Sequence, residues 1–302
     1  MSKIIQQQNT PLKRGGVPEI VREKCTNCGL CTELCLVYEK GADGVSRVRP
    51  ELCIECGHCG SICPAGAIAG SSAEKVRLKK EDLGKLPSPE SLQLLFRSRR
   101  SVRRYKREPL RKEDLEKILE AGRYTPTGSN NQGIRYIIIN DPGKMAVLRE
   151  MALPVMDRLF SMAMRIAKLP FAGKLMGERQ AYDLRTHYAP AIKLLIKRNM
   201  DGDDRLFYRA PALMIVHGEK QDEALCFACH IAMFNCSMMA HLLGVGCLLN
   251  SFVLMAINNN AKIKKWLGIP KGDKCFGAMI MGYQNIKYNS LIERNPANVK
   301  WL

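Results

Sequence analysis

"CTNCGLCTELC" at residues 25–35 and "CIECGHCGSICP" at residues 53–64 decide the architecture of the first part of the chain. Each run spaces four cysteines as C-x2-C-x2-C-x3-C, a spacing typical of the ligands of [4Fe–4S] clusters. The alternatives are a disulfide framework and zinc. The N-terminal residues do not read as a secretory signal, which disfavours disulfides, and a zinc site takes four ligands rather than two tandem runs of four. The spacing therefore predicts two four-iron clusters.

In this pattern the fourth cysteine of each run ligates the cluster of the other run. The first predicted cluster is held by Cys25, Cys28, Cys31 and Cys63, and the second by Cys53, Cys56, Cys59 and Cys35. Pro64 follows the second run as the pattern requires, whereas Leu36 occupies the equivalent position after the first. We expect a two-cluster ferredoxin-like domain over residues 1–75, held together by its clusters, and a polar linker over residues 76–89.

The composition indicates a folded protein with an anionic partner. The chain has 302 residues, 46% of them hydrophobic, and 47 basic against 29 acidic side chains give a formal net charge of +18. Residues 224–257 are apolar and long enough to be considered as a membrane span, but polar residues and two glycines interrupt them. We expect a buried helix followed by a strand there, no membrane span, and a cytoplasmic protein.

From residue 90 onward the pattern is that of a mixed α/β domain. Buried strands are predicted at 134–140, 211–218 and 275–283, and helices at 112–122 and 258–270. A methionine-rich stretch at residues 150–205 predicts amphipathic helices. Cys226, Cys229 and Cys236 share one face of a helix, where we favour core packing over a third metal site.

"RSRRSVRRYKRE" at residues 97–108 carries seven basic side chains and one acid. Nucleic-acid binding would favour interleaved aromatic residues, and Tyr105 is the only one. Arg99, Ser101 and Arg103 alternate along an extended segment, so their side chains can converge on one phosphate group. We favour a small bound phosphate over nucleic acid, and a solvated basic face remains the alternative.

Five segments resemble the nitroreductase family of FMN enzymes, and they occur in the family's order. They are "RRSVRRY", "LEKILEAGRYTPTGSNNQ", "AHLLGVGCLLNSF", "LGIPKGDKCFGAMIMGY" and "YNSLIERNP". The resemblance covers residues 90–302, and the preceding region is similar to a subgroup with an N-terminal two-cluster extension. It implies an α+β protein, with a small two-cluster ferredoxin-like domain followed by a nitroreductase-like α/β sandwich domain.

The resemblance also implies FMN-binding residues. The FMN phosphate and ribityl chain would be held by Arg99, Arg100, Ser101 and Arg103, with Arg294 and, as a weaker candidate, Lys287. FMN would be reached across a homodimer interface by Thr127, Gly128, Ser129 and Asn130, with Gln132 in support. The backbone of Leu249, Asn250 and Ser251 would face the flavin ring. After Gln132 the chain has "GIR", where the family often has Pro-Trp. The resemblance therefore does not predict how the wall of the pocket beside Arg135 is formed.

The predicted function is an FMN-dependent oxidoreductase of nitroreductase type. Electrons from ferredoxin, or from NAD(P)H, would pass through the two clusters to FMN and then to an apolar or aromatic acceptor such as a nitro compound, quinone or enoate. The alternative is a non-catalytic electron-transfer or redox-sensing flavoprotein. Residues 150–205 would cap the active site or, alternatively, complete the core or the dimer interface. No residue is assigned a catalytic role.

Overall fold

The computed structural model describes residues 17–70 and 78–302, and the chain divides into two units. The first unit comprises Met1–Ser88 together with Pro126–Gln132, and the second comprises Pro89–Thr125 and Gly133–Leu302. The expected domain boundary at residues 75 and 76 lies outside the described residues. The N-terminal residues 1–16, where no secretory signal was expected, also lie outside them. A short helix, α3 (Lys80–Leu83), lies in the segment expected to be a linker.

The first unit consists of short helices and strands, and its two cysteine runs have the same local backbone conformation. The stretch that carries the two cysteine runs forms two helices and two antiparallel strand pairs, in the order β1 (Glu19–Ile20), α1 (Leu30–Leu34), β2 (Tyr38–Gly41), β3 (Gly44–Arg47), α2 (His58–Ile62) and β4 (Ile68–Ala69), with 3-10 turns at Arg22–Lys24 and Pro50–Leu52. The helix α3 and a 3-10 turn at Gly128–Asn130 also belong to this unit. Gly29 and Gly57 precede the two helices with φ of 84° and 78°. Because this left-handed region favours glycine, each cysteine run carries the turn that redirects the chain between its second and third cysteines.

The second unit is a four-stranded antiparallel sheet in the order β5-β6-β8-β7. The strands are β5 (Arg135–Ile139), β6 (Ala212–Glu219), β7 (Val245–Leu249) and β8 (Asp273–Tyr283). The three predicted strands are therefore present, but β5, at the edge of the sheet, is half-buried and not buried as predicted. β6 and β8 lie in the centre and are buried along nearly their whole length, because helices cover both faces of the sheet.

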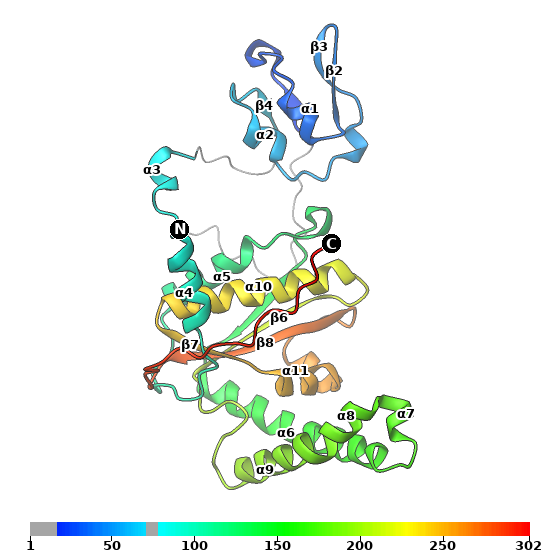
Figure 1. The fold of residues 1–302 in the computed structure, drawn as a ribbon, viewed down its shortest axis with the longest axis vertical. Coiled ribbons are helices and arrows are strands. Elements are labelled where there is room, and N and C mark those ends of the chain that lie inside the picture. Colours follow the sequence, from blue (N-terminus) through cyan, green and yellow to red (C-terminus); the bar gives the residue numbers. More distant parts are fainter. Residues whose placement is uncertain (1–16, 71–77) are drawn as a thin grey trace. The chain divides into compact units, whose positions relative to one another are not determined.

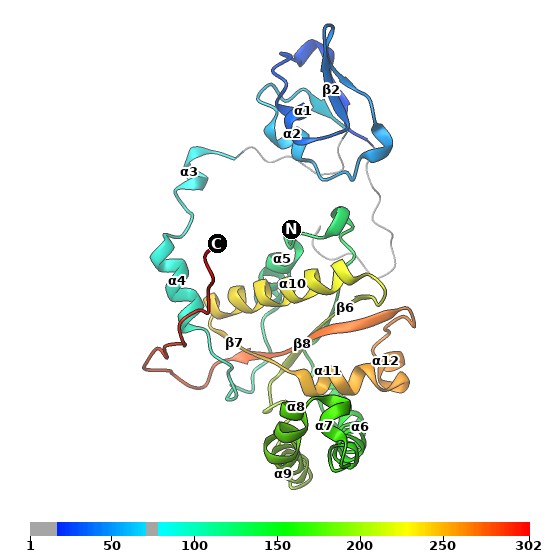
Figure 2. The same cartoon turned by 45° about the vertical axis from the view of Figure 1, so that its right-hand side comes forward.

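Figures 1 and 2 show the layers of the second unit. One face of the sheet is covered by α5 (Lys112–Arg123) and α10 (Glu223–Leu242), and the other by α6 (Pro142–Ala167), α11 (Ser251–Asn258) and α12 (Ala261–Trp266). On the first face, a Cβ at Gly122 would lie 2.7 Å from Cys236 Sγ, so the glycine allows α5 and α10 to pack closely. The α/β sandwich expected from the resemblance is confirmed.

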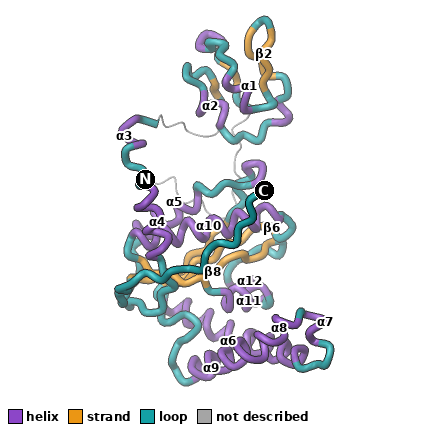
Figure 3. The backbone as a smooth tube through the Cα atoms, in the orientation of Figure 1, coloured by secondary structure: helices purple, strands orange, loops and turns teal. Residues whose placement is uncertain are grey.

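The methionine-rich stretch is helical, as predicted. It contains most of α6, followed by α7 (Ala172–Met176), α8 (Glu178–Asp183), a π-helical turn (Leu184–Tyr188) and α9 (Ala189–Met200). Figure 3 shows that the chain is irregular after β8, from residue 284 to the C-terminus. Before the sheet, α4 (Pro89–Ser98) leads into the basic segment.

Residues 224–257 form a helix and a strand as predicted, and then a second helix, α11, that the sequence analysis did not anticipate. Among the described residues, α10 is the one helix with the length and composition of a membrane span, and half of its apolar window is buried in the protein. Burial raises the pKa of the Cys229 and Cys236 thiols to about 12. Both lie in the core against the sheet, as expected for packing residues.

Candidate functional site

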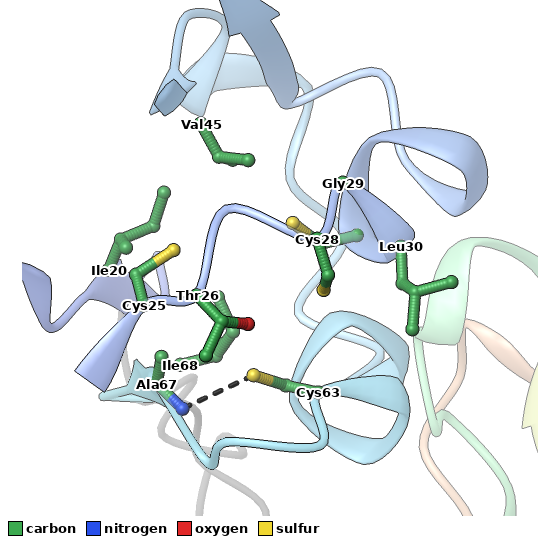
Figure 4. Close-up of a pocket in the computed structure, with 11 residues that line it drawn as sticks. Ile20, Cys25, Thr26, Cys28, Gly29, Leu30, Val45, Cys63, Ala67 and Ile68 are labelled. Carbon is green, nitrogen blue, oxygen red and sulfur yellow. Dashed lines mark hydrogen bonds between the residues drawn. The ribbon is translucent and has the colours of Figure 1, made fainter. Parts of the chain in front are cut away.

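The four cysteines of the first predicted cluster line one small pocket in the first unit. Figure 4 shows Cys25, Cys28 and Cys63 around it, and Cys31 also lines it. Cys63 belongs to the second run, so the structure brings together the ligand set that exchanges one cysteine between runs. Apolar side chains, among them Val45, line the rest of the cavity. This sulfur-rich, apolar setting suits a [4Fe–4S] cluster.

The second set, Cys35, Cys53, Cys56 and Cys59, lines another cavity of the same unit. Burial raises the pKa of the Cys59 thiol, so positive iron would supply the charge that stabilises its thiolate. Backbone N–H groups already face cysteine sulfurs of both sets. Glu55 N lies 3.4 Å from Cys53 Sγ, and Ala67 N lies 3.2 Å from Cys63 Sγ. In residues 17–70 and 78–302, no three His, Cys, Asp or Glu side chains are grouped to hold a single metal ion.

The candidate phosphate-binding segment lies beside β7 in the second unit. Val102 N donates to Cys247 O at 2.9 Å, and Ser101 forms a parallel bridge with the same residue. The segment is extended, with Val102 buried while Ser101 and Arg103 are exposed. Ser101 and Arg103 therefore lie on the open side of the segment, as expected. Arg99, the third residue of the expected set, is half-buried, and its backbone N–H donates to Leu95 O at the end of α4.

Two facing glycines provide the space in which this segment packs. Gly246 of β7 is paired with Gly282 of β8. A Cβ on Gly246 would lie 2.8 Å from Val102 Cβ, and one on Gly282 would lie 3.0 Å from Tyr105 Cδ1. Real Cβ atoms almost never approach so closely. The missing side chains at these two positions let the basic segment pack closely against β7 and β8.

The C-terminal segment contacts the same basic run. Asn285 N donates to Arg104 O at 3.0 Å, and Arg97 forms an ion pair with Glu293. Arg100 Nη2 also donates to Ser290 O at 3.4 Å. These contacts bring the part of the chain that carries Lys287 and Arg294 to the predicted phosphate site. Both side chains are exposed.

Leu249, Asn250 and Ser251 continue from β7, just beyond the residue that pairs with Ser101. Asn250 is buried, and its side chain is fully used by the fold. Its Oδ1 accepts from Val253 N at 3.1 Å as the N-cap of α11, and its Nδ2 donates to Leu206 O at 2.7 Å. Asn250 therefore positions the backbone of this turn, while the side chain of Leu249 is exposed.

The loop at residues 204–209 completes this edge, and the sequence analysis missed it. Tyr208 and Arg209 have φ of 54° and 55°, a region that residues other than glycine rarely adopt. The Asp204 carboxylate holds the loop by accepting from three backbone N–H groups, at 2.8 to 3.1 Å. The Tyr208 ring centroid lies 5.9 Å from Arg103 Cζ. Such backbone strain is concentrated at functional sites, and its only signal in the sequence is a turn-forming aspartate.

The remaining candidates, Thr127, Gly128, Ser129, Asn130 and Gln132, belong to the segment that groups with the first unit. They form a tight turn in which Gln132 N donates to Thr127 Oγ1 at 3.0 Å. Asn130 Nδ2 donates to the carbonyl oxygens of Ile54 and Glu55, at 3.3 and 3.1 Å. These five residues are thus gathered in one turn of the first unit.

Comparison with known proteins identifies both parts of the chain. The model of the Nitroreductase family matches residues 96–283, and the model of the 4Fe-4S dicluster domain matches residues 17–64. No curated protein was found to match the chain.

Solved structures with a similar fold are distant in sequence. A nitroreductase with bound FMN from Bacteroides fragilis NCTC 9343 is 21% identical, with 69% of this chain and 98% of that chain covered and a TM-score of 0.49. One with bound FMN from Desulfitobacterium hafniense DCB-2 is 20% identical, with 69% and 97% covered and a TM-score of 0.49. An FMN-dependent nitroreductase from Clostridium difficile R20291 is 16% identical, with 68% and 98% covered and a TM-score of 0.48.

The family model spans more than half of the chain and includes the basic segment, the sheet and the turn after β7. The resemblance noted in the sequence is therefore confirmed. The chain belongs to the nitroreductase family, as an FMN-dependent oxidoreductase that carries an iron–sulfur domain at its N-terminal end.

Proposed function

We propose that this cytoplasmic protein passes electrons from ferredoxin through two [4Fe–4S] clusters to FMN, and from FMN to a small apolar or aromatic acceptor. The observation that carries the proposal is the cavity lined by Cys25, Cys28, Cys31 and Cys63, which joins the two cysteine runs within a nitroreductase-family chain. Clusters carry single electrons, and FMN, when bound, accepts single electrons and delivers a hydride. The two kinds of cofactor together connect a one-electron donor to a two-electron reduction.

The basic segment would hold the FMN phosphate. Ser101 and Arg103 are exposed on the same side of an extended segment whose position is set by Val102 and β7. A guanidinium forms charge-assisted hydrogen bonds with phosphate, and Arg103 is oriented by the Tyr208 ring beside it. Lys287 and Arg294 would add positive charge from the C-terminal segment.

The turn after β7 would support the flavin ring. Asn250 fixes this turn through both ends of its amide, so the backbone from Leu249 to Ser251 is held rigidly. A rigid backbone can present N–H groups to a ring without the entropy cost of ordering a side chain. The role of Asn250 in this proposal is to position the backbone.

We propose that residues 150–205 cap this site. α6 packs on α11, the helix that begins at Ser251, and Phe160 meets Phe252 edge-on with ring centroids 6.2 Å apart. Residues 150–205 therefore contact the helix that begins at the candidate flavin-binding turn. Its methionines suit an apolar pocket that adapts to its ligand. Shortening residues 155–180 should change acceptor preference while FMN occupancy stays full, and unchanged kinetics with every acceptor would rule out a cap.

The proposed assembly is a homodimer in which Thr127, Gly128, Ser129 and Asn130, supported by Gln132, reach the FMN of the other copy. Sedimentation of the FMN-loaded protein tests this, because a flavin-loaded monomer would contradict it. The formal net charge of +18 suits docking of an acidic ferredoxin as donor. NAD(P)H is the alternative donor.

The function is tested by screening acceptors against the anaerobically reduced protein. Nitroaromatics, quinones and enoates should reoxidise the flavin at rates that saturate with acceptor concentration for the correct class. An electron carrier or redox sensor, the second candidate function, would show no saturable dependence on any small acceptor. That outcome would overturn the enzymatic proposal.

A further inference from the structure

Tyr38, at the start of β2, buries a hydroxyl group against a cysteine sulfur of the second cluster set. The residue is 3% exposed and packs in the core of the first unit. Its Oη lies 3.7 Å from Cys59 Sγ and 3.2 Å from Pro18 O. The hydroxyl has one proton for these two acceptors. A phenol keeps this proton at neutral pH.

The two cysteine sets have different polar surroundings. In the second set, Cys53 Sγ faces Glu55 N at 3.4 Å and Cys59 Sγ faces the Tyr38 hydroxyl. In the first set, Cys63 Sγ faces Ala67 N at 3.2 Å. Backbone N–H groups thus face sulfurs of both sets, and the Tyr38 hydroxyl is a side-chain donor to the second set.

Asn27 adds to this difference on the side of the first set. Its Oδ1 accepts from Val45 N at 3.3 Å, which fixes the orientation of the amide, and lies 3.6 Å from Cys25 Sγ. A cysteine that ligates iron has no proton to donate. The sulfur of Cys25 would then face the electron-rich end of the Asn27 amide, which disfavours added negative charge on the first cluster.

The donor on the second set has a defined electrochemical effect. One-electron reduction adds negative charge to a cluster and its thiolates, and the sulfurs become stronger hydrogen-bond acceptors. A donor therefore stabilises the reduced form more than the oxidised form, and the reduction potential rises.

We propose that Tyr38 donates to Cys59 and sets the potential of the second cluster above that of the first. This inference rests on the proposed function, since it requires both clusters. With the first cluster held by Cys25, Cys28, Cys31 and Cys63 and the second by Cys35, Cys53, Cys56 and Cys59, an electron on the first would then favour the second. The first would be oxidised as the second is reduced, without transfer of a proton. Tyr38 would influence the potential of the second cluster through its hydrogen bond to the Cys59 sulfur.

The test is Tyr38→Phe, which removes the oxygen and keeps the ring. EPR-monitored redox titration of the anaerobic protein should show a lower potential for the second cluster, which is identified by the signal that Cys56→Ser perturbs. We expect the distribution of one electron between the clusters to shift about tenfold toward the first, which corresponds to about 59 mV. Thr32→Val is the matched control, because the Thr32 hydroxyl donates to Gly29 O at 2.7 Å.

A second substitution should shift the potential of the second cluster in the opposite direction. It also provides a test if Tyr38→Phe binds its clusters poorly. Replacing Tyr38 by 3-fluorotyrosine keeps the hydroxyl and makes it a stronger donor, so the potential of the second cluster should rise. An unchanged potential in either loaded variant overturns the inference. Iron content is measured in parallel. Iron for a single cluster in the native protein overturns the two-cluster proposal itself, whereas full loading with unshifted potentials overturns only the role of Tyr38.

Discussion

Gly246→Ala should displace the basic segment, the candidate FMN-phosphate site, from β7. The added methyl carbon would lie 2.8 Å from both Val102 Cβ and Val102 Cγ1, and 2.8 Å from Gln284 Cγ. Val102 is buried and its backbone is bonded to the next residue of β7, so it has little room to move away. Overpacking of this kind costs about 1–3 kcal/mol. For a domain of this size the melting temperature should fall by roughly 2–12 °C.

The assay is thermal unfolding of the purified protein together with its ratio of FMN to polypeptide. Because Ser101 and Arg103 flank Val102, a shift of the segment should lower FMN occupancy as well as stability. Gly272→Ala is the control, since a Cβ there would meet no atom within 4 Å. Val102→Ala should partly rescue Gly246→Ala, and the double variant should lose less than the sum of the two. The reasoning is refuted if Gly246→Ala keeps the FMN content and melting temperature of Gly272→Ala.

Three further changes have defined outcomes. Arg103→Ala should lower FMN affinity, because a lost charge-assisted contact costs about 1.5–3 kcal/mol. The measurement is a flavin titration of the apoprotein, and native affinity in this variant would contradict the phosphate site. Cys63→Ser should damage the first cluster more than the second in EPR spectra, and equal damage would argue against the assigned ligand sets. Although burial opposes it, hydrogen bonds from Arg135 and His217 hold the pKa of Asp273 below its ordinary value. The free energy that these hydrogen bonds contribute to folding is present above the unfolded-state pKa of Asp273. It is lost as the pH falls through the lower pKa that Asp273 has in the folded protein. Melting curves of Asp273→Asn and the native chain should therefore converge in acid, and a constant difference would refute this.

Local patterns predicted most of the scaffold. The strands β6 and β8 were recognisable as runs of buried apolar residues, and β5 as a short apolar run at the edge of the sheet, half-buried apart from Ile139. Cysteine spacing predicted the ligand sets because short spacings limit which sulfurs can surround one cube. By contrast, α11 follows β7 within one apolar stretch, and an apolar run alone does not distinguish a helix from a strand.

The missing parts of the candidate site depend on contacts between distant residues. The role of Gly246 is visible only when Val102 is seen against it, and these residues are far apart in sequence. The left-handed backbone at Tyr208 and Arg209 is held by hydrogen bonds to Asp204, which propensities do not encode. Asn250 was identified by resemblance, but its use as a helix cap required the structure.

The central claim is that electrons reach FMN through the clusters. Stopped-flow absorbance under anaerobic conditions follows cluster and flavin reduction after mixing with reduced ferredoxin. In the intact protein, cluster reduction should precede flavin reduction, and a Cys28→Ser, Cys56→Ser double variant that keeps FMN should reduce its flavin far more slowly. Flavin reduction at the native rate in the variant without clusters would contradict the account.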